Sequence, residues 1–193
     1  MTTFIILLRG VTPTGRNKVP MAPLRAALMQ AGLRDVRTYI QSGNVIAQSD
    51  LTHREIEGLV HDVIRRTLGG DIAVVARTPA QFADILKRNP FGDVEGTRLY
   101  FTLLADEPDT ARLQQLLSAD FSPDRVLYES KTIYTLYATK HSDSKFNNNF
   151  FERKLKVAAT TRNRNTMAKL AALTGLPPTD SYASFESDAS PFR

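Results

Sequence analysis

The sequence predicts an α+β fold in which one order of elements, β-α-β-β-α-β, occurs twice. Short apolar runs alternate with segments whose apolar residues follow helical spacing, and Gly or Pro residues stand at the boundaries between them. Corresponding strands of the two series begin near residues 4 and 99, 36 and 126, and 44 and 132, which are offsets of 95, 90 and 88 residues. A nearly constant offset indicates an internal repeat.

The first series begins with the continuous apolar run of residues 4–8, which is typical of a strand buried on both faces. Pro20 suits the first turn of a helix that Gly32 ends, and Ser42-Gly43 predicts a tight hairpin between the next two strands. Helical spacing then begins after Thr52 and stops at Gly69. The expected strands are residues 4–8, 36–40, 44–48 and 72–76, and the expected helices are residues 20–32 and 52–68.

The second series follows a connecting helix, residues 78–87, that Thr78 caps and Pro79 begins. Ser130-Lys131 predicts the turn between its second and third strands. We expect strands 98–104, 125–129 and 132–138 and helices 109–118 and 148–156, with a final helix 166–173 in the place of the last strand. The predicted architecture is therefore two tandem ferredoxin-like (βαββαβ) units with extra C-terminal helices.

This reading divides the chain into a first unit (residues 1–77), a helical connector (78–96), a second unit (97–176) and a flexible acidic tail (177–193). The tail carries three acids against one Arg and lacks helical or strand periodicity.

Composition excludes several classes of chemistry. The chain has no Cys, so disulfides, thiolate metal sites and thiol nucleophiles are absent. Its three histidines include no pair four residues apart, and it contains no G-x-S-x-G elbow. We therefore expect no metal and no cofactor. With no secretory signal and no apolar run near the roughly 20 residues that cross a bilayer, we expect a cytoplasmic protein without membrane contact, of undetermined oligomeric state.

Several strings in chain order carry a family resemblance. They are Leu8-Arg9-Gly10, GRNKVPM at residues 15–21, VRTYIQSGNV at residues 36–45, Asn89-Pro90-Phe91 and Thr160-Thr161-Arg162-Asn163. Over residues 3–176 the chain resembles the bacterial family catalogued as domain of unknown function 1697. The resemblance implies paired ferredoxin-like units and brings no established activity. The chain differs at Val11-Thr12, where the family has Ile-Asn, and at Arg164, where the family has Trp.

A basic, amide-rich run from Lys140 to Asn165 holds seven Lys or Arg residues and two acids, a balance of +5 that equals the net charge of the whole chain. The first half of this run predicts an amphipathic helix whose cations face solvent. In the second half, Thr160 or Thr161 is a natural N-cap, which would place Arg162 and Arg164 in the first turn of a helix. Cations are disfavoured there by the helix dipole, and a bound anion would relieve the conflict.

A second candidate segment is the loop after the first strand, residues 10–17, which has the glycine spacing of a Walker A loop. Arg16 and Asn17 replace its Lys and hydroxyl residue, so NTP hydrolysis is not expected, although the loop could contact an anion. The candidate anion-binding residues are Arg9, Arg16, Asn17, Lys18, Arg37, Gln41, Asn44, Lys145, Arg162, Asn163, Arg164 and Asn165.

These residues favour a cytoplasmic binder of a phosphate-bearing ligand or nucleic acid. One alternative is an enzyme that acts on a phosphorylated small molecule by positioning and electrostatics, with no identifiable catalytic residue. The other is a protein-interaction module that docks an acidic partner.

Overall fold

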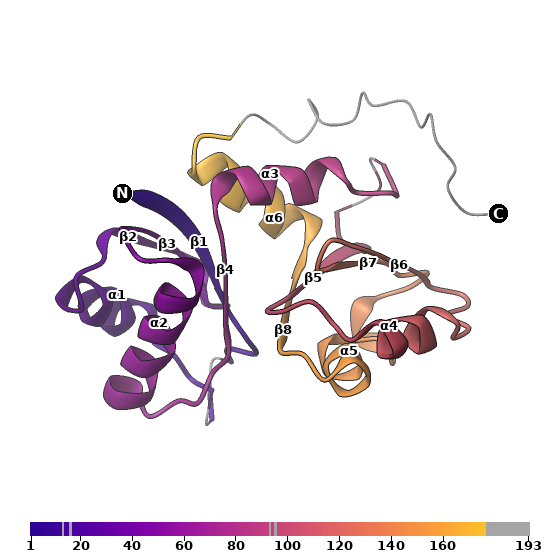
Figure 1. The fold of residues 1–193 in the computed structure, drawn as a ribbon, viewed down its shortest axis with the longest axis horizontal. Helices are drawn as coiled ribbons and strands as arrows, with labels where there is room; N and C mark the ends of the chain where they lie inside the picture. Colours follow the sequence, from indigo (N-terminus) through magenta and orange to yellow (C-terminus); the bar gives the residue numbers. More distant parts are fainter. Residues whose placement is uncertain (13, 16, 93, 95, 177–193) are drawn as a thin grey trace.

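The computed structural model describes residues 1–12, 14–15, 17–92, 94 and 96–176, which form a mixed α+β structure with two four-stranded antiparallel sheets and six α-helices (Figure 1). The first sheet has the order β2-β3-β1-β4, in which every neighbouring pair is antiparallel. Its elements are β1 (Thr2–Leu8), α1 (Met21–Gln30), β2 (Arg34–Tyr39), β3 (Asn44–Ser49), α2 (His53–Leu68) and β4 (Val74–Arg77).

The second sheet repeats this arrangement with the order β6-β7-β5-β8. Helix α3 (Pro79–Lys87) leads from the first sheet to the second. The remaining elements are β5 (Leu99–Leu104), α4 (Thr110–Leu117), β6 (Arg125–Glu129), β7 (Thr132–Leu136), the 3-10 turn η1 (His141–Asp143), α5 (Asn148–Leu155), β8 (Ala159–Asn163) and α6 (Arg164–Leu173).

The apolar side chains of the described residues form three clusters. One lies between the first sheet and helices α1 and α2, and another lies between the second sheet and helices α4 and α5. The third is shared: it joins the opposite faces of both sheets to α3 and α6, which lie side by side above the two sheets in Figure 1. Residues such as Ile5, Phe82, Phe101 and Met167 are at most 2% exposed in this shared core. The first half of the chain (β1 to β4, with the first sheet) and the second half (β5 to α6, with the second sheet) are therefore packed as one body.

The prediction of a helix capped by Thr160 or Thr161 is wrong. Residues Ala159–Asn163 form β8, which pairs antiparallel with β5 from Ala159 opposite Leu104 to Asn163 opposite Tyr100. Helix α6 follows this strand instead of replacing it, and its N-cap is Asn163, whose side chain accepts a hydrogen bond from the Thr166 amide. Arg162 is thus a strand residue, and only Arg164 lies in the first turn.

The two predicted turns differ in outcome. The β2–β3 connection is not a two-residue hairpin: Tyr39 pairs with Asn44, so the loop has four residues. Gly43 within it has φ 76°, and a Cβ there would lie 2.7 Å from the Leu8 Cβ, so only glycine fits. The Ser130-Lys131 turn is confirmed, with φ values of 45° and 60° that are typical of a type I′ hairpin.

Strand registers define equivalent positions in the two halves. Leu8 faces Val74 and Ile5 faces Arg77 in the first sheet, whereas Leu104 faces Ala159 and Phe101 faces Arg162 in the second. Arg77 and Arg162 are therefore equivalent residues, each followed by the N-cap of a helix, α3 or α6. In the same way α2 and α5 follow the caps Thr52 and Asn147, which makes Glu57 equivalent to Glu152.

The acidic tail predicted for residues 177–193 lies outside the described residues. No helix in the described ranges is long and apolar enough to cross a membrane.

Candidate functional site

A cavity of about 450 Å³ lies where the loop after β1 meets the start of α5 and the strand β8. Both halves of the chain contribute to it. It is lined by Arg9, Gly10, Val11, Asn17 and Ser42 from the first half and by Tyr100, His141, Asn147, Asn148, Asn149, Thr160, Thr161 and Arg162 from the second.

Arg162 forms the buried wall of this cavity, with 8% of its surface exposed. Its Nε donates to Asn44 Oδ1 (2.6 Å), and its Nη1 donates to Thr160 Oγ1 and the Thr161 carbonyl (both 2.8 Å). Its Nη2 donates to the carbonyls of Leu8 (2.9 Å), Ser42 (2.9 Å) and Gly43 (3.2 Å). Each guanidinium nitrogen is thus satisfied by neutral acceptors, most of which belong to the first half.

The charge of Arg162 is not balanced in the way that the charge of Arg77 is. Burial lowers the pKa of Arg77, but the nearby carboxylates of Glu57 and Asp106 oppose that effect. Burial lowers the pKa of Arg162 to about 10, and no carboxylate of a described residue opposes it. Among the described residues, the buried guanidinium of Arg162 in the cavity wall is therefore held by neutral acceptors, and no carboxylate raises its pKa.

The difference has an identifiable cause. Glu152, the counterpart of Glu57, is held by Arg9, whose Nε lies 2.9 Å from Oε1 and whose Nη2 lies 2.7 Å from Oε2. Hydrogen bonding to this carboxylate raises the pKa of Arg9, against a smaller opposing effect of burial. Arg9 directly follows β1, and the corresponding residue after β5 is Ala105. Glu57 therefore has no counterpart of Arg9 with which to form an ion pair. The carboxylate of Glu152 is thus paired with Arg9.

Three consecutive amides line the same cavity at the N-terminus of α5. Asn147 Oδ1 accepts from the Phe150 amide (3.1 Å), Asn148 Oδ1 accepts from the Thr161 hydroxyl (2.9 Å), and Asn149 Oδ1 accepts from Arg9 (3.0 Å). None of the three side-chain nitrogens donates a hydrogen bond to a described residue. Because their oxygens are fixed by protein donors, the amides offer N–H groups to a ligand, beside the positive end of a helix dipole.

Tyr100 and His141 form the remaining aromatic wall. Their rings stack with centroids 4.5 Å apart and an interplanar angle of 14°. Burial lowers the pKa of His141, so its imidazole is neutral at pH 7, and its Nε2 is buried without a hydrogen-bond partner among the described residues. The same two rings border a second cavity of about 650 Å³, which is lined also by Thr97, Arg98, Thr139, Lys140, Ser142 and Asp143.

Comparison with known proteins shows the family of the chain. Residues 1–134 match the model of a family described as protein of unknown function (DUF1697). The chain belongs to the DUF1697 family. The match ends before the Thr160–Asn163 string on which part of the resemblance rested. A search of curated proteins finds no match.

A solved structure described as that of the conserved bacterial protein SP0830 from Streptococcus pneumoniae is similar to this DUF1697 protein in fold. The two share 21% sequence identity, and the TM-score is 0.75 over 91% of this chain and 99% of that one. At this identity the similarity concerns the fold alone.

Three of the candidate anion-binding residues that the structure describes line the cavity: Arg9, Asn17 and Arg162. Asn17 donates through Nδ2 to the Gly10 carbonyl (3.2 Å) and so fixes the loop after β1. Arg16 lies outside the described residues. The other candidates lie elsewhere.

Most of those others have structural contacts of their own. Asn44 is fully buried. Its Oδ1 accepts a hydrogen bond from the Arg162 Nε and its Nδ2 donates to the Tyr39 carbonyl, so it holds the Arg162 guanidinium in the cavity wall. Arg37 donates to the Leu173 carbonyl at 3.2 Å and pairs with Asp35. Lys145 lies over the Phe146 ring, with Nζ 5.0 Å from its centroid.

The remaining candidates divide between two regions. Lys18 and Gln41 border a smaller cavity of about 230 Å³ near α1. Asn163 is the cap of α6, Arg164 begins that helix, and Asn165 lies against Gly96, where an added Cβ would be 1.9 Å from its Oδ1. Of the candidate residues 162–165, Arg162 lines the 450 Å³ cavity and the other three do not.

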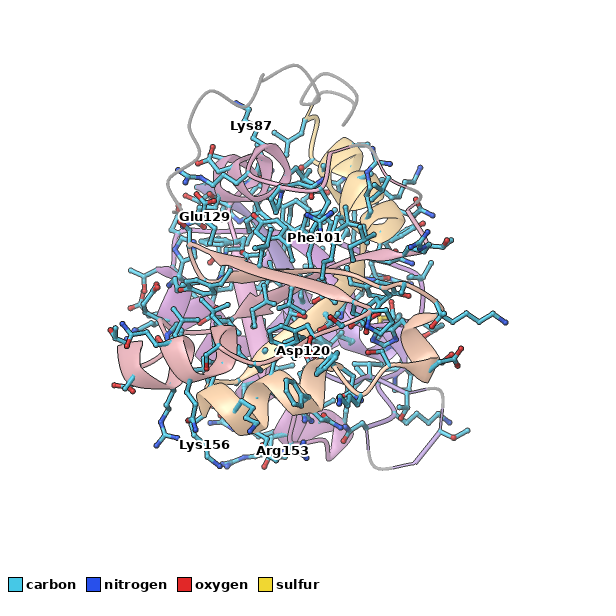
Figure 2. All side chains as sticks on the ribbon, turned by 90° about the vertical axis from the view of Figure 1, so that its right-hand side faces the viewer. Lys87, Phe101, Asp120, Glu129, Arg153 and Lys156 are labelled. Carbon is cyan, nitrogen blue, oxygen red and sulfur yellow. The ribbon has the colours of Figure 1, made fainter. Side chains whose placement is uncertain are left out.

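Sequence reasoning missed Tyr100, His141 and the three amides Asn147–Asn149. The sequence shows the run of asparagines, but its helical pattern predicts only an amphipathic helix and no ligand contact for them. The part of that interpretation that concerns cations holds: Arg153, Lys154 and Lys156 are exposed, and Figure 2 shows Arg153 and Lys156 projecting outward at the opposite end of the molecule from Lys87. The described residues contain no group of His, Asp or Glu side chains that could hold a metal ion.

Proposed function

We propose that this DUF1697 protein is a cytoplasmic protein that binds a small phosphate-bearing anion in the 450 Å³ cavity between its two halves. We also propose that the halves are two copies of one ferredoxin-like unit, because the sheets share the order 2-3-1-4 and the same antiparallel pairings. The cavity then lies where the two copies have diverged in charge.

The observation that carries the proposal is the buried guanidinium of Arg162 in the cavity wall, whose hydrogen bonds to described residues all go to neutral acceptors, whereas Glu57 and Asp106 lie near its counterpart Arg77. An anion about 5 Å from this guanidinium would gain about 3 kcal/mol at an effective dielectric constant of about 20, which corresponds to roughly a hundredfold in affinity. Because the Arg162 donors are all engaged, the ligand would receive its hydrogen bonds from the amides of Asn147, Asn148 and Asn149 and the free N–H groups of α5.

The dimensions of the site favour a small ligand over a nucleic acid strand. A strand needs a continuous basic groove, whereas these donors converge on a single cavity. Small-ligand binding should weaken only slightly as salt rises, while nucleic-acid binding would lose about one unit of log–log slope for each phosphate contacted.

Isothermal titration with inorganic phosphate tests the proposal through the substitution Asn148→Asp. The aspartate keeps the acceptor for the Thr161 hydroxyl and suits the first turn of α5, so the fold should be retained. It removes one N–H donor and adds a negative charge, so we expect phosphate affinity to fall at least tenfold. Gln114→Glu on the exposed face of α4 makes the same charge change away from the cavity and should leave affinity unchanged. Absence of phosphate binding by the unmodified protein, or equal binding by both variants, would contradict the proposal.

A further inference from the structure

Two neighbouring cavities border the stacked rings of Tyr100 and His141. Both aromatic residues line the 450 Å³ cavity and the 650 Å³ cavity, so the two spaces share one wall. Each volume falls within the range of roughly 300–1,000 Å³ that is common for small-molecule sites. Inorganic phosphate would leave most of this space unfilled, which indicates a ligand with two parts.

The second cavity differs in chemistry from the first. None of the described residues that line it is one of the three asparagines at the start of α5. Its lining combines the aromatic pair with the hydroxyl residues Thr97, Thr139 and Ser142. Lys140 and Asp143 place one donor group and one acceptor group at its border, and Arg98 is fixed there by its Nε, which donates to the Tyr137 carbonyl at 2.8 Å. An aromatic face surrounded by mixed donors and acceptors is suited to a heteroaromatic ring with polar edges.

We propose that the ligand is a nucleoside monophosphate whose phosphate occupies the cavity beside Arg9 and Asn148 and whose base occupies the cavity beside Thr139 and Ser142, packed against the Tyr100–His141 pair. This inference rests on the proposed function, because the phosphate half is the anion site described above. The neutral imidazole of His141 supports the base half, since an uncharged ring pair does not require a second counterion. Stacking of a base on an aromatic side chain contributes about 1–3 kcal/mol.

Titration with inorganic phosphate, ribose 5-phosphate and AMP separates the two halves of the site. AMP should bind at least tenfold more tightly than either inorganic phosphate or ribose 5-phosphate. The double variant Thr139→Leu/Ser142→Leu changes two exposed residues that border only the second cavity. By filling that cavity it should reduce AMP affinity to the level of inorganic phosphate while the phosphate affinity itself stays unchanged.

The outcomes are distinguishable. If AMP binds no more tightly than inorganic phosphate, the nucleotide inference is overturned and the anion site stands. If ribose 5-phosphate binds as tightly as AMP, the second cavity takes a sugar and the base assignment is overturned. If neither phosphate nor AMP binds, both the inference and the proposed function fail. Asn148→Asp should weaken AMP and phosphate alike, and a loss of phosphate binding alone would contradict a shared site.

Discussion

At the scale of single residues, Arg162 both links the two halves through hydrogen bonds and places a positive charge beside the cavity. Its guanidinium joins β8 to the end of β1 and to the β2–β3 loop through carbonyl acceptors, and Arg77 makes the equivalent reach from β4 to the Leu104 carbonyl (2.6 Å). Neutral acceptors can satisfy the hydrogen bonds of a buried guanidinium but not its charge. One residue therefore stabilises the interface between halves and leaves a positive potential beside it.

Arg162→Met should destabilise the protein by on the order of 3 kcal/mol or more. The Met side chain fills similar space but leaves the buried Asn44 Oδ1 and the part-buried Ser42 carbonyl without the donors that Arg162 supplies, while the Leu8 carbonyl keeps only the Thr160 hydroxyl. Urea unfolding followed by circular dichroism measures the change. Arg153→Met on the exposed face of α5 is the matched control and should shift stability by less than about 0.5 kcal/mol. A loss for Arg162→Met no larger than for the control would show that its hydrogen bonds are replaced by water.

His141 predicts a specific pH dependence of stability. Burial lowers its pKa in the folded protein, so below the ordinary histidine value of about 6.5 the unfolded chain binds more protons than the folded one. Stability should therefore fall as pH drops through this window. His141→Phe keeps a ring that can stack on Tyr100 but cannot titrate, so the difference between melting temperatures at pH 7.5 and pH 5.5 should be smaller in the variant. An equal difference in both proteins would exclude His141 as its source.

At the scale of elements, the polar strand β8 is the feature on which the site depends. Its sequence, ATTRN, contains neither an apolar run nor an alternation of apolar and polar residues. Thr160 and Arg162 are nevertheless buried, because their polar groups meet acceptors across the interface: Thr160 Oγ1 lies 3.2 Å from the Leu8 carbonyl. The backbone of β8 pairs with β5 in its own half, but its buried polar side chains depend on acceptors that the first half supplies.

The Ser130-Lys131 turn offers a test at this scale. Both residues have positive φ values, of 45° and 60°, which cost a non-glycine residue roughly 1 kcal/mol. Lys131→Gly should therefore raise the free energy of unfolding by about 0.5–1 kcal/mol, as read from the urea midpoint. Lys140 is an exposed residue with φ −75°, so Lys140→Gly should lower stability instead. Destabilisation by Lys131→Gly would show that the Lys131 side chain contributes more than its backbone strain costs.

The elements that could be predicted from the sequence are those with their own local signal. The apolar run at β1, the capping box of Thr52 with Glu55, and the Thr78-Pro79 start of α3 each specify their element without reference to distant residues. Strand β8 has no such signal, and its threonines resemble helix caps. The length of the loop that ends at Gly43 has no local signal either: Ser42-Gly43 is typical of a two-residue turn, but the carbonyls of both residues accept hydrogen bonds from the distant Arg162.

At the scale of the whole molecule, the shared core makes the two halves one folding unit. Ile5 and Val75 from the first sheet pack in the same cluster as Phe101 and Leu103 from the second. Arg162 and Thr160 add hydrogen bonds across the same interface. Apolar surface of this extent would be exposed if either half unfolded alone.

Leu116→Ala tests this coupling, because Leu116 is buried only in the core between the second sheet and α4 and α5. The substitution should cost about 2–5 kcal/mol. If the halves unfold together, amide hydrogen exchange at Ile6 and Val45 of the first half should accelerate as much as exchange at Ile133 of the second. Unchanged protection in the first half would mean that it unfolds independently.

The location of the candidate site could not be predicted at this scale, although several of its residues were named. Arg162 is far from Arg9 and Asn17 in the chain, and no local pattern indicates that the three border one cavity. Their approach follows from the packing of one half on the other. The net charge of the Lys140–Asn165 run does not indicate which of its cations border a cavity, because the pairing of Arg9 with Glu152 joins residues that are 143 positions apart.

Arg77 and Arg162 cross the interface in opposite directions, so we expect a chain cut between the two sheets to reassemble from its two fragments. Each arginine donates to a carbonyl that the other half supplies, Leu104 for Arg77 and Leu8 for Arg162. Two separately expressed polypeptides, cut in the connection between α3 and β5, would each lack acceptors and core contacts and should be unstructured alone. Mixed together, they should recover the native fold and create the ligand cavity only in the reconstituted pair. A DUF1697 protein of this design could serve as a split reporter whose signal requires complementation.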